Sequence, residues 1–199
     1  MMRNKLATAV AAMAFGVSAQ AVPIFADNFD ADATGLNQAP TGWTVSSGTV
    51  DVVGNGVDDR VPGNGVYIDL DGTTSLAGLL TSPSLNLTAG LTYTATFDLA
   101  GSQLGSTETG VVTFGSQSLN YSLASAAPFT TFSLSFTPST SGAYALSFHN
   151  DGGDDVGALL DNVVVNQVTV PVPEPETYAL LLAGLAVLGA VSWRRRPSA

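Results

Sequence analysis

Residues 91–99 read Leu-Thr-Tyr-Thr-Ala-Thr-Phe-Asp-Leu, with apolar and polar side chains in strict alternation. Successive side chains of a β-strand point to opposite faces of the sheet, so Tyr93, Ala95 and Phe97 share one face while the intervening threonines share the other. Tyrosine, phenylalanine and threonine are also enriched in strands. The stretch therefore predicts a strand with one face in a core and the other in water.

The same alternation recurs in residues 131–136 and 144–148, where aromatic residues and leucine alternate with small residues. Between them, Pro138 to Gly142 reads Pro-Ser-Thr-Ser-Gly, which is turn chemistry. We therefore expect these two strands to pair as a hairpin. Further strands are expected at residues 23–29, 42–53, 65–70, 76–80, 85–87, 109–114, 117–123 and 158–168.

Residues 22–168 contain no convincing helical periodicity, and turn residues separate the expected strands at short intervals. This pattern predicts an all-β fold, a two-sheet β-sandwich. Residues 22–170 are enough for one domain with its own core. Because the chain contains no cysteine, its stability must come from burial, with a bound metal ion as a further source.

The C-terminal end consists of three segments. Residues 171–177 form a stalk rich in proline and glutamate, residues 178–193 are almost entirely apolar, and residues 194–199 begin with Arg194, Arg195 and Arg196. An apolar helix over 178–193 rises about 24 Å, so it crosses the roughly 30 Å hydrocarbon core only marginally. The sequence predicts a short transmembrane helix, and the arginines favour a cytoplasmic C-terminus.

The N-terminal residues 1–21 have the pattern of a secretory signal peptide. Arg3 and Lys5 precede an apolar run over residues 6–17, and Ala19 and Ala21 supply the small residues that signal peptidase recognises. We expect cleavage after Ala21. A retained N-terminal anchor is the alternative.

The motif Pro173-Glu174-Pro175, followed by the apolar segment and the arginines, resembles the PEP-CTERM sorting signal of Gram-negative bacteria. The resemblance implies processing by a membrane-embedded exosortase, which in that family acts near the motif. It also implies an exported protein, first anchored in the inner membrane and then placed at the cell surface or outside the cell. Its carriers are commonly exported by bacteria that make extracellular polysaccharide. An ordinary single-span anchor with a proline-rich stalk is the alternative.

Charge is distributed very unevenly along the chain. Five of the six basic residues lie in the terminal segments, which leaves Arg60 against fourteen aspartates and glutamates in residues 22–172. Such a surface repels phosphate groups, so nucleic acid and anionic lipid surfaces are excluded as direct partners of this domain at ordinary salt. Neutral glycans and cations remain, and solubility outside the cell is an alternative reason for the acidity.

Three segments of the domain, residues 27–30 (Asp-Asn-Phe-Asp), 42–43 (Gly-Trp) and 159–165 (Leu-Leu-Asp-Asn-Val-Val-Val), resemble jelly-roll modules of the carbohydrate-binding type. In that group, a carboxylate just after the first-strand phenylalanine and an aspartate in the last strand often hold a structural calcium ion. The resemblance implies Asp30 and Asp161 as the corresponding ligands. The first of them is aspartate here, where glutamate is usual.

Asp161 is also unusual for its position on the expected last strand. Alternation places it on the same face as Leu159 and Val163, which predicts a carboxylate in the core. A buried charge needs a cation, backbone donors or protonation, and calcium is a natural partner in a domain with so few basic groups. Exposure of Asp161 at a bulge or a strand end is the alternative.

Sugar binding requires aromatic faces beside polar groups that fix the orientation of the ligand. Tyr67, Tyr121 and Trp43 are the best candidates. Trp43 follows a turn and begins an alternating strand, so we expect it to pack in the core. Tyr67 shares its predicted face with Asp69 and Asp71, which predicts an exposed aromatic ring beside hydrogen-bond acceptors. A purely structural role for this face is the alternative.

Catalysis is not expected from this composition. Residues 22–172 contain no cysteine or lysine, one histidine (His149) and one glutamate (Glu108), and no Gly-x-Ser-x-Gly motif occurs. Two functions remain for an exported protein: a module that binds extracellular polysaccharide, or a structural matrix protein without a specific ligand. A glycan-active enzyme that uses paired carboxylates is a third, weaker alternative.

Overall fold

The computed structural model describes residues 22–168 and 175–194. Residues 21–168 form one compact unit, and the C-terminal helix belongs to a second unit. Ala19, Ala21 and the rest of the expected signal peptide lie outside the described residues. So do residues 169–174 and 195–199, which include Pro173, Glu174, Arg195 and Arg196.

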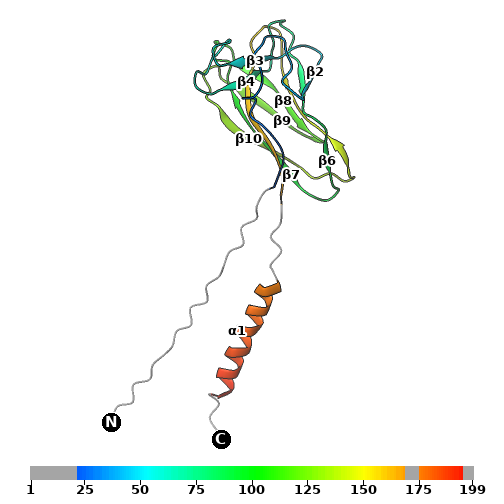
Figure 1. Ribbon diagram of the computed structural model, residues 1–199, viewed down its shortest axis with the longest axis vertical. Helices are drawn as coiled ribbons and strands as arrows, with labels where there is room; N and C mark the ends of the chain where they lie inside the picture. Colours follow the sequence, from blue (N-terminus) through cyan, green and yellow to red (C-terminus); the bar gives the residue numbers. More distant parts are fainter. Residues whose placement is uncertain (1–21, 169–174, 195–199) are drawn as a thin grey trace, which may run out of the picture. The chain divides into compact units, whose positions relative to one another are not determined.

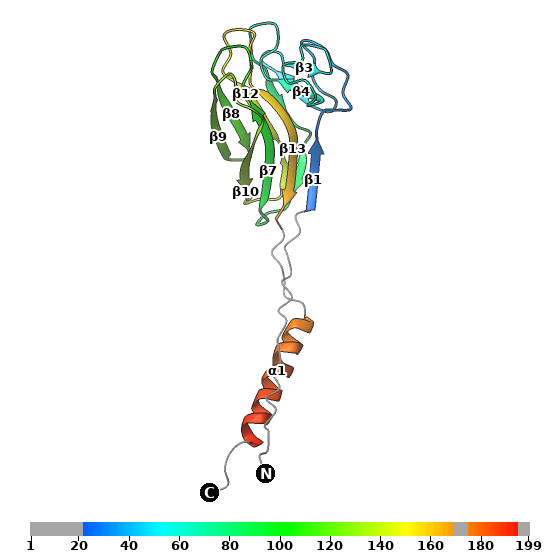
Figure 2. The same ribbon diagram turned by 90° about the vertical axis from the view of Figure 1, so that its left-hand side faces the viewer.

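The domain is an all-β sandwich of the jelly-roll kind with two main sheets (Figure 1). In the first sheet, antiparallel strands follow the order β10-β7-β13-β4-β3, and β1 also pairs with β13. Figure 2 shows β1 and β7 on either side of β13. The strands are β1 (Val22–Asp27), β3 (Asp51–Gly54), β4 (Val66–Asp69), β7 (Tyr93–Ala100), β10 (Thr130–Phe136) and β13 (Leu159–Gln167).

The second sheet follows the order β2-β5-β12-β8-β9 and is antiparallel throughout. A separate two-stranded ladder joins β6 to β11. The strands are β2 (Thr44–Ser46), β5 (Leu79–Thr81), β6 (Leu85–Leu87), β8 (Glu108–Phe114), β9 (Gln117–Leu123), β11 (Gly142–Tyr144) and β12 (Leu146–Asn150).

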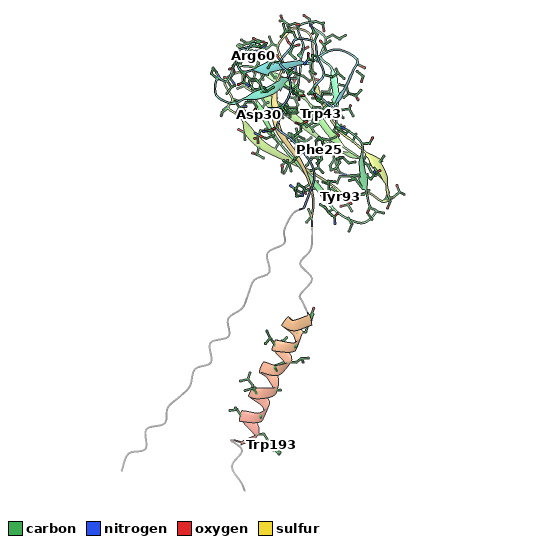
Figure 3. The ribbon with its side chains drawn as sticks, viewed as in Figure 1. Phe25, Asp30, Trp43, Arg60, Tyr93 and Trp193 are labelled. Carbon is green, nitrogen blue, oxygen red and sulfur yellow. The ribbon has the colours of Figure 1, made fainter. Side chains whose placement is uncertain are left out.

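The main core lies between the two sheets and contains the apolar face of β7. Tyr93, Ala95, Phe97 and Leu99 are at most 2% exposed, as the alternation predicts. An aromatic cluster joins the sheets around Trp43, which Figure 3 shows beside Phe25. The Trp43 ring lies 5.7 Å from Phe25, 5.6 Å from Phe29 and 6.1 Å from Phe148, measured between ring centroids.

The predicted hairpin between residues 131–136 and 144–148 is wrong. Strand β10 pairs with β7 in the first sheet, whereas β12 pairs with β5 and β8 in the second. The connection from Pro138 to Gly142 therefore leads from the first sheet into β11, and the chain reaches the second sheet only at β12. Alternation identifies the buried face of each strand, but the inner faces of a sandwich carry the same pattern, so it does not assign a strand to a sheet.

Helix α1 (Pro175–Arg194) contains the apolar segment 178–193 that was expected to be helical. It begins three residues earlier than expected, at Pro175, because proline is well tolerated in the first turn of a helix. Within the described residues, no helix combines the length and the apolar character needed to cross a membrane.

Candidate functional site

Tyr67 is a buried structural residue, and the prediction of an exposed aromatic ring is wrong. Its side chain is 0% exposed and packs edge-on against Phe129 on the side of the first sheet that faces away from the main core. The hydroxyl accepts hydrogen bonds from the backbone N–H groups of Arg60 (2.6 Å) and Val61 (2.9 Å) and donates to Asp59 (3.1 Å). Burial raises the pKa of Tyr67 to about 12.

Asp69 is also fully buried, and it pairs with the only lysine or arginine side chain of residues 22–168. Arg60 Nη1 lies 2.7 Å from Asp69 Oδ2, and Arg60 Nη2 lies 2.6 Å from Asp58 Oδ2. The Arg60 side chain is 7% exposed, the Asp69 side chain 0% and the Asp58 side chain 42%. Burial raises the pKa of Asp69 to about 7, and the positive charge of Arg60 opposes that effect.

Tyr121 is likewise removed from solvent, because it is 5% exposed. Its hydroxyl donates to Asn150 Oδ1 at 3.0 Å, and burial raises the Tyr121 pKa. Tyr67, Asp69 and Tyr121 therefore form no sugar-stacking surface. Within the described residues 22–168, no aromatic side chain is among the exposed large apolar groups.

An open pocket of about 490 Å³ lies where five loops of the sandwich converge. The loops connect β1 to β2, β3 to β4, β4 to β5, β7 to β8 and β12 to β13. Figure 3 shows Arg60 at the end of the domain opposite to Tyr93. The pocket is lined by Leu36, Asp58, Arg60, Thr73, Leu104, Asp155 and Val156.

The pocket combines exposed aliphatic groups with hydrogen-bonding groups. Leu36 is 50% exposed and Leu104 is 55% exposed, so both present apolar surface to a ligand. The carboxylates of Asp58 and Asp155 are acceptors and the guanidinium of Arg60 is a donor. The residues come from five separate loops, and no local sequence pattern indicates that they meet.

Asp161 is buried, as predicted, but on a different face from the one expected. A register shift follows Asp161 in β13, where Asn162 adopts a left-handed conformation with φ of 51°. Such a bulge inserts an extra residue and reverses the alternation. Val163 and Val165 consequently join the main core, and Asp161 shares the opposite face with Leu159. Asp161 is nevertheless only 3% exposed.

The Asp161 carboxylate accepts hydrogen bonds from Asn64 Nδ2 (2.8 Å) and from the backbone N–H of Asn162 (2.6 Å). Burial raises its pKa to about 6, and the negative charge of Asp30 adds to the effect. Asp30 in turn accepts from the backbone N–H of Val66 at 3.0 Å. The two expected calcium ligands thus both contact the segment of residues 64–66. Within the described residues, no three acidic, histidine or cysteine side chains form a group that could hold a metal ion.

The C-terminal segment matches a family model, described as the PEP-CTERM protein-sorting motif, over residues 171–196. The match confirms the predicted sorting signal, which implies that the protein is exported and sorted. It covers only the terminal part of the chain and does not describe the β-sandwich. No curated protein matches the sequence.

Several solved structures are similar to the domain in fold. The CBM22-1 xylan-binding domain of Paenibacillus barcinonensis Xyn10C superposes with a TM-score of 0.54 at 13% identity over 78% of this chain and 100% of that one. The K3 cleaved adhesin domain of Lys-gingipain from Porphyromonas gingivalis gives 0.53 at 13% identity, over 74% and 99%. These similarities confirm the predicted jelly-roll sandwich.

A multimodular protein also resembles the domain. The CBM22-1 and GH10 modules of Clostridium thermocellum xylanase 10B, solved with xylohexaose, give a TM-score of 0.51 at 16% identity over 76% of this chain. The similarity spans only 30% of the xylanase chain. At this level of identity, the resemblance concerns the fold alone.

Proposed function

We propose that the protein is an exported, exosortase-processed component of the cell surface or extracellular matrix, and that its domain is a non-catalytic module that binds a neutral polysaccharide. The pocket of about 490 Å³ at the converging loops carries the proposal, because two exposed leucines and several hydrogen-bonding side chains meet in it. The sorting motif supports the location. The jelly-roll fold, which recurs in carbohydrate-binding modules, supports the class of ligand.

Sugar rings present C–H faces and hydroxyl edges, and the pocket offers a partner for each. Leu36 and Leu104 cover the C–H faces, while Asp58 and Asp155 accept hydrogen bonds from hydroxyl groups. The fourteen acidic residues of residues 22–172 oppose an anionic polymer, so a neutral polysaccharide fits best.

In this proposal, two enzymes process the chain, one at each end. Signal peptidase removes residues 1–21, and an exosortase recognises Pro173-Glu174-Pro175. Before that step, residues 178–193 hold the protein at the inner membrane, and Arg194, Arg195 and Arg196 keep the C-terminus in the cytoplasm. The domain is then released to the cell surface or the extracellular space.

Binding to the pocket is tested with an array of neutral polysaccharides and the purified full chain. The variant Leu36→Ala/Leu104→Ala is expected to bind about tenfold more weakly, because it removes the apolar contacts without touching the core. Leu91→Ala is the matched control, since Leu91 is an exposed leucine outside the pocket. Unchanged binding by the double variant would show that the ligand lies elsewhere.

A structural role in the matrix is the second candidate, and the surface of the domain favours it. Every aromatic side chain of the described residues 22–168 is buried or half-buried, and none is among the exposed large apolar groups. Hydroxyl groups instead pair across the outer face of the first sheet, as between Thr94 Oγ1 and Ser135 Oγ at 2.8 Å. Failure of the folded wild-type chain to bind any polysaccharide on the array would favour this role.

A glycan-active enzyme has less support than either role. Glu108 is 4% exposed, its Oε1 accepts a hydrogen bond from Ser106, and its Oε2 lies 3.4 Å from Asn150 Nδ2. A general acid must reach the glycosidic oxygen of its substrate. Glu108 lies in the interior and is poorly placed for that task.

We also propose a structural calcium ion between Asp30 and Asp161. All hydrogen-bond donors that reach Asp161 are neutral, so its buried charge has no cationic partner among them. A half-turn of the Asn64 side-chain amide would present its carbonyl oxygen to the ion in place of its N–H group. Amide carbonyl oxygens are ligands that calcium accepts. Backbone oxygens or water would complete the shell.

Calcium is expected to raise the melting temperature of the wild-type chain by several degrees, because it binds only the folded state. Asp161→Ala is expected to remove the part of this gain that comes from the calcium ion between Asp30 and Asp161. Differential scanning calorimetry in calcium and in chelator measures the effect, with Asp32→Ala as a control carboxylate. Identical melting curves of the wild type in the two conditions would contradict the proposal.

A further inference from the structure

Buried negative charge gathers beneath the loops at the pocket end of the sandwich. The carboxylates of Asp51, Asp69, Asp71 and Glu108 are each at most 4% exposed. The side chain of Arg60 pairs with one of these, Asp69. Buried charges are costly unless they are paired and hydrogen-bonded, so each of the other three needs an explanation.

Asp71 differs from the others in having no partner for either carboxylate oxygen. Asp51 Oδ1 accepts from the backbone N–H of Asn37 at 2.6 Å, and Glu108 contacts Ser106 and Asn150. The residue Asp71 is 0% exposed, yet neither Oδ1 nor Oδ2 has a hydrogen-bond partner within the described residues. Both carboxylate oxygens of Asp71 are thus buried without a partner within the described residues.

The loop of residues 151–157, which reads Asp-Gly-Gly-Asp-Asp-Val-Gly, covers this carboxylate. A Cβ atom at Gly152 would lie 3.5 Å from Asp71 Oδ2, and one at Gly157 would collide with the Asp71 backbone. Position 157 therefore requires a residue without a side chain, whereas a side chain at position 152 would first meet the backbone of Ala77. The loop also brings the exposed aspartates Asp154 and Asp155 to the same region.

Electrostatics agrees with this geometry. Burial raises the pKa of Asp71 to about 7, and the nearby negative charge of Asp154 is the next largest cause. Asp71 accepts no hydrogen bond that would offset these effects. A divalent cation would offset the repulsion between carboxylates that lie close together without hydrogen-bond donors.

We propose that Asp71 anchors a second calcium site, which Asp154, Asp155 and backbone carbonyls of the loop 151–157 complete when the loop closes on the ion. Calcium suits these groups because it takes six to eight oxygen ligands in flexible geometry, including carbonyls and water. A complete set of three acidic side chains is not preformed among the described residues. The loop therefore supplies ligands by adjusting around the buried carboxylate. The site depends neither on glycan binding nor on Asp30 and Asp161.

Calcium titration of the full chain by isothermal titration calorimetry tests the site after chelator treatment. The measurement is made in an Asp161→Asn background, so that the first calcium site does not contribute. One calcium ion is expected to bind, and adding Asp71→Asn is expected to weaken binding at least about tenfold. Asp151→Asn is the matched control, because it removes one charge from the same loop while Asp151 is engaged by Thr109.

Unchanged calcium affinity after Asp71→Asn would overturn the proposal, as would a folded Asp161→Asn chain that binds no calcium. If the Asp161→Asn chain is unstable, the wild type and Asp71→Asn are compared directly, and the loss of one bound calcium is expected. Melting temperatures separate the site from a merely structural role. In chelator, the melting temperature of Asp71→Asn should be equal to or above that of the wild type, because a buried charge is gone. Calcium should then raise the melting temperature of the wild type more than that of Asp71→Asn. Equal destabilisation in both conditions would overturn the proposal.

Discussion

Replacement of Arg60 by glutamine is expected to lower the free energy of unfolding by about 3–5 kcal/mol. Arg60 Nη1 lies 2.7 Å from Asp69 Oδ2, and the Asp69 side chain is 0% exposed. Removing the guanidinium leaves a buried carboxylate with one hydrogen-bond donor within the described residues, the backbone N–H of Asp71 at 3.1 Å. Removing Arg60 alone therefore lowers the free energy of unfolding far more than the intact ion pair raises it.

Two companion variants identify the source of this loss. Asp58→Asn removes the partner that is 42% exposed, so it should change stability by less than about 1 kcal/mol. Arg60→Gln/Asp69→Asn removes both buried charges and should recover most of the stability that Arg60→Gln loses. Denaturant unfolding of the full chain measures all three. An equal cost for Arg60→Gln and Asp58→Asn would show that burial of Asp69 is not the cause.

Leu36 and Leu104 are better positions than Arg60 for testing the pocket by substitution. Arg60 lines the pocket, but the same side chain neutralises Asp69 inside the domain. A binding defect in an Arg60 variant would therefore combine lost contact with lost stability. Leu36 and Leu104 are half exposed, so their truncation changes the pocket while the core stays intact.

Sequence alternation identified the core faces of strands that are buried on one side. In β7, the predicted inward residues are buried and the intervening threonines are partly exposed. Both main sheets contain such strands, and this is enough for the sandwich class. Alternation could not identify the neighbour of each strand, which is why β10 and β12 were wrongly paired.

Alternation did not identify the buried residues of a strand that is covered on both faces. All four residues of β4 are buried, because the loop before it covers the side on which Tyr67 and Asp69 lie. Period-two alternation says nothing about such a loop. At Asp161, a single bulge reversed the faces, and its only local signal is Asn162, a residue that tolerates the left-handed conformation. The pocket depends on the meeting of five loops, which no local pattern encodes.

Replacement of Trp43 by alanine is expected to lower the free energy of unfolding by about 3–5 kcal/mol. Trp43 is 6% exposed and contacts Phe25 and Phe29 near the first sheet and Phe148 in the second. Its truncation removes the ring that joins the two sheets and leaves a cavity in close-packed surroundings. The loss should appear as a lower denaturant midpoint with little change in the slope of the transition.

Trp43→Phe separates the packing of the ring from its hydrogen bond. The variant keeps an aromatic ring in the cluster but loses the bond from Nε1 to Asp27 Oδ2, which is 2.8 Å long. We expect it to cost about 1–2 kcal/mol, because the lost bond and the smaller ring each contribute modestly. Trp193→Ala, at a residue that is 75% exposed in α1, should change the unfolding of the domain by less than about 0.5 kcal/mol. A cost for Trp43→Ala no larger than that for Trp43→Phe would mean that the sandwich repacks around the missing ring, and that Trp43 serves mainly to hold Asp27.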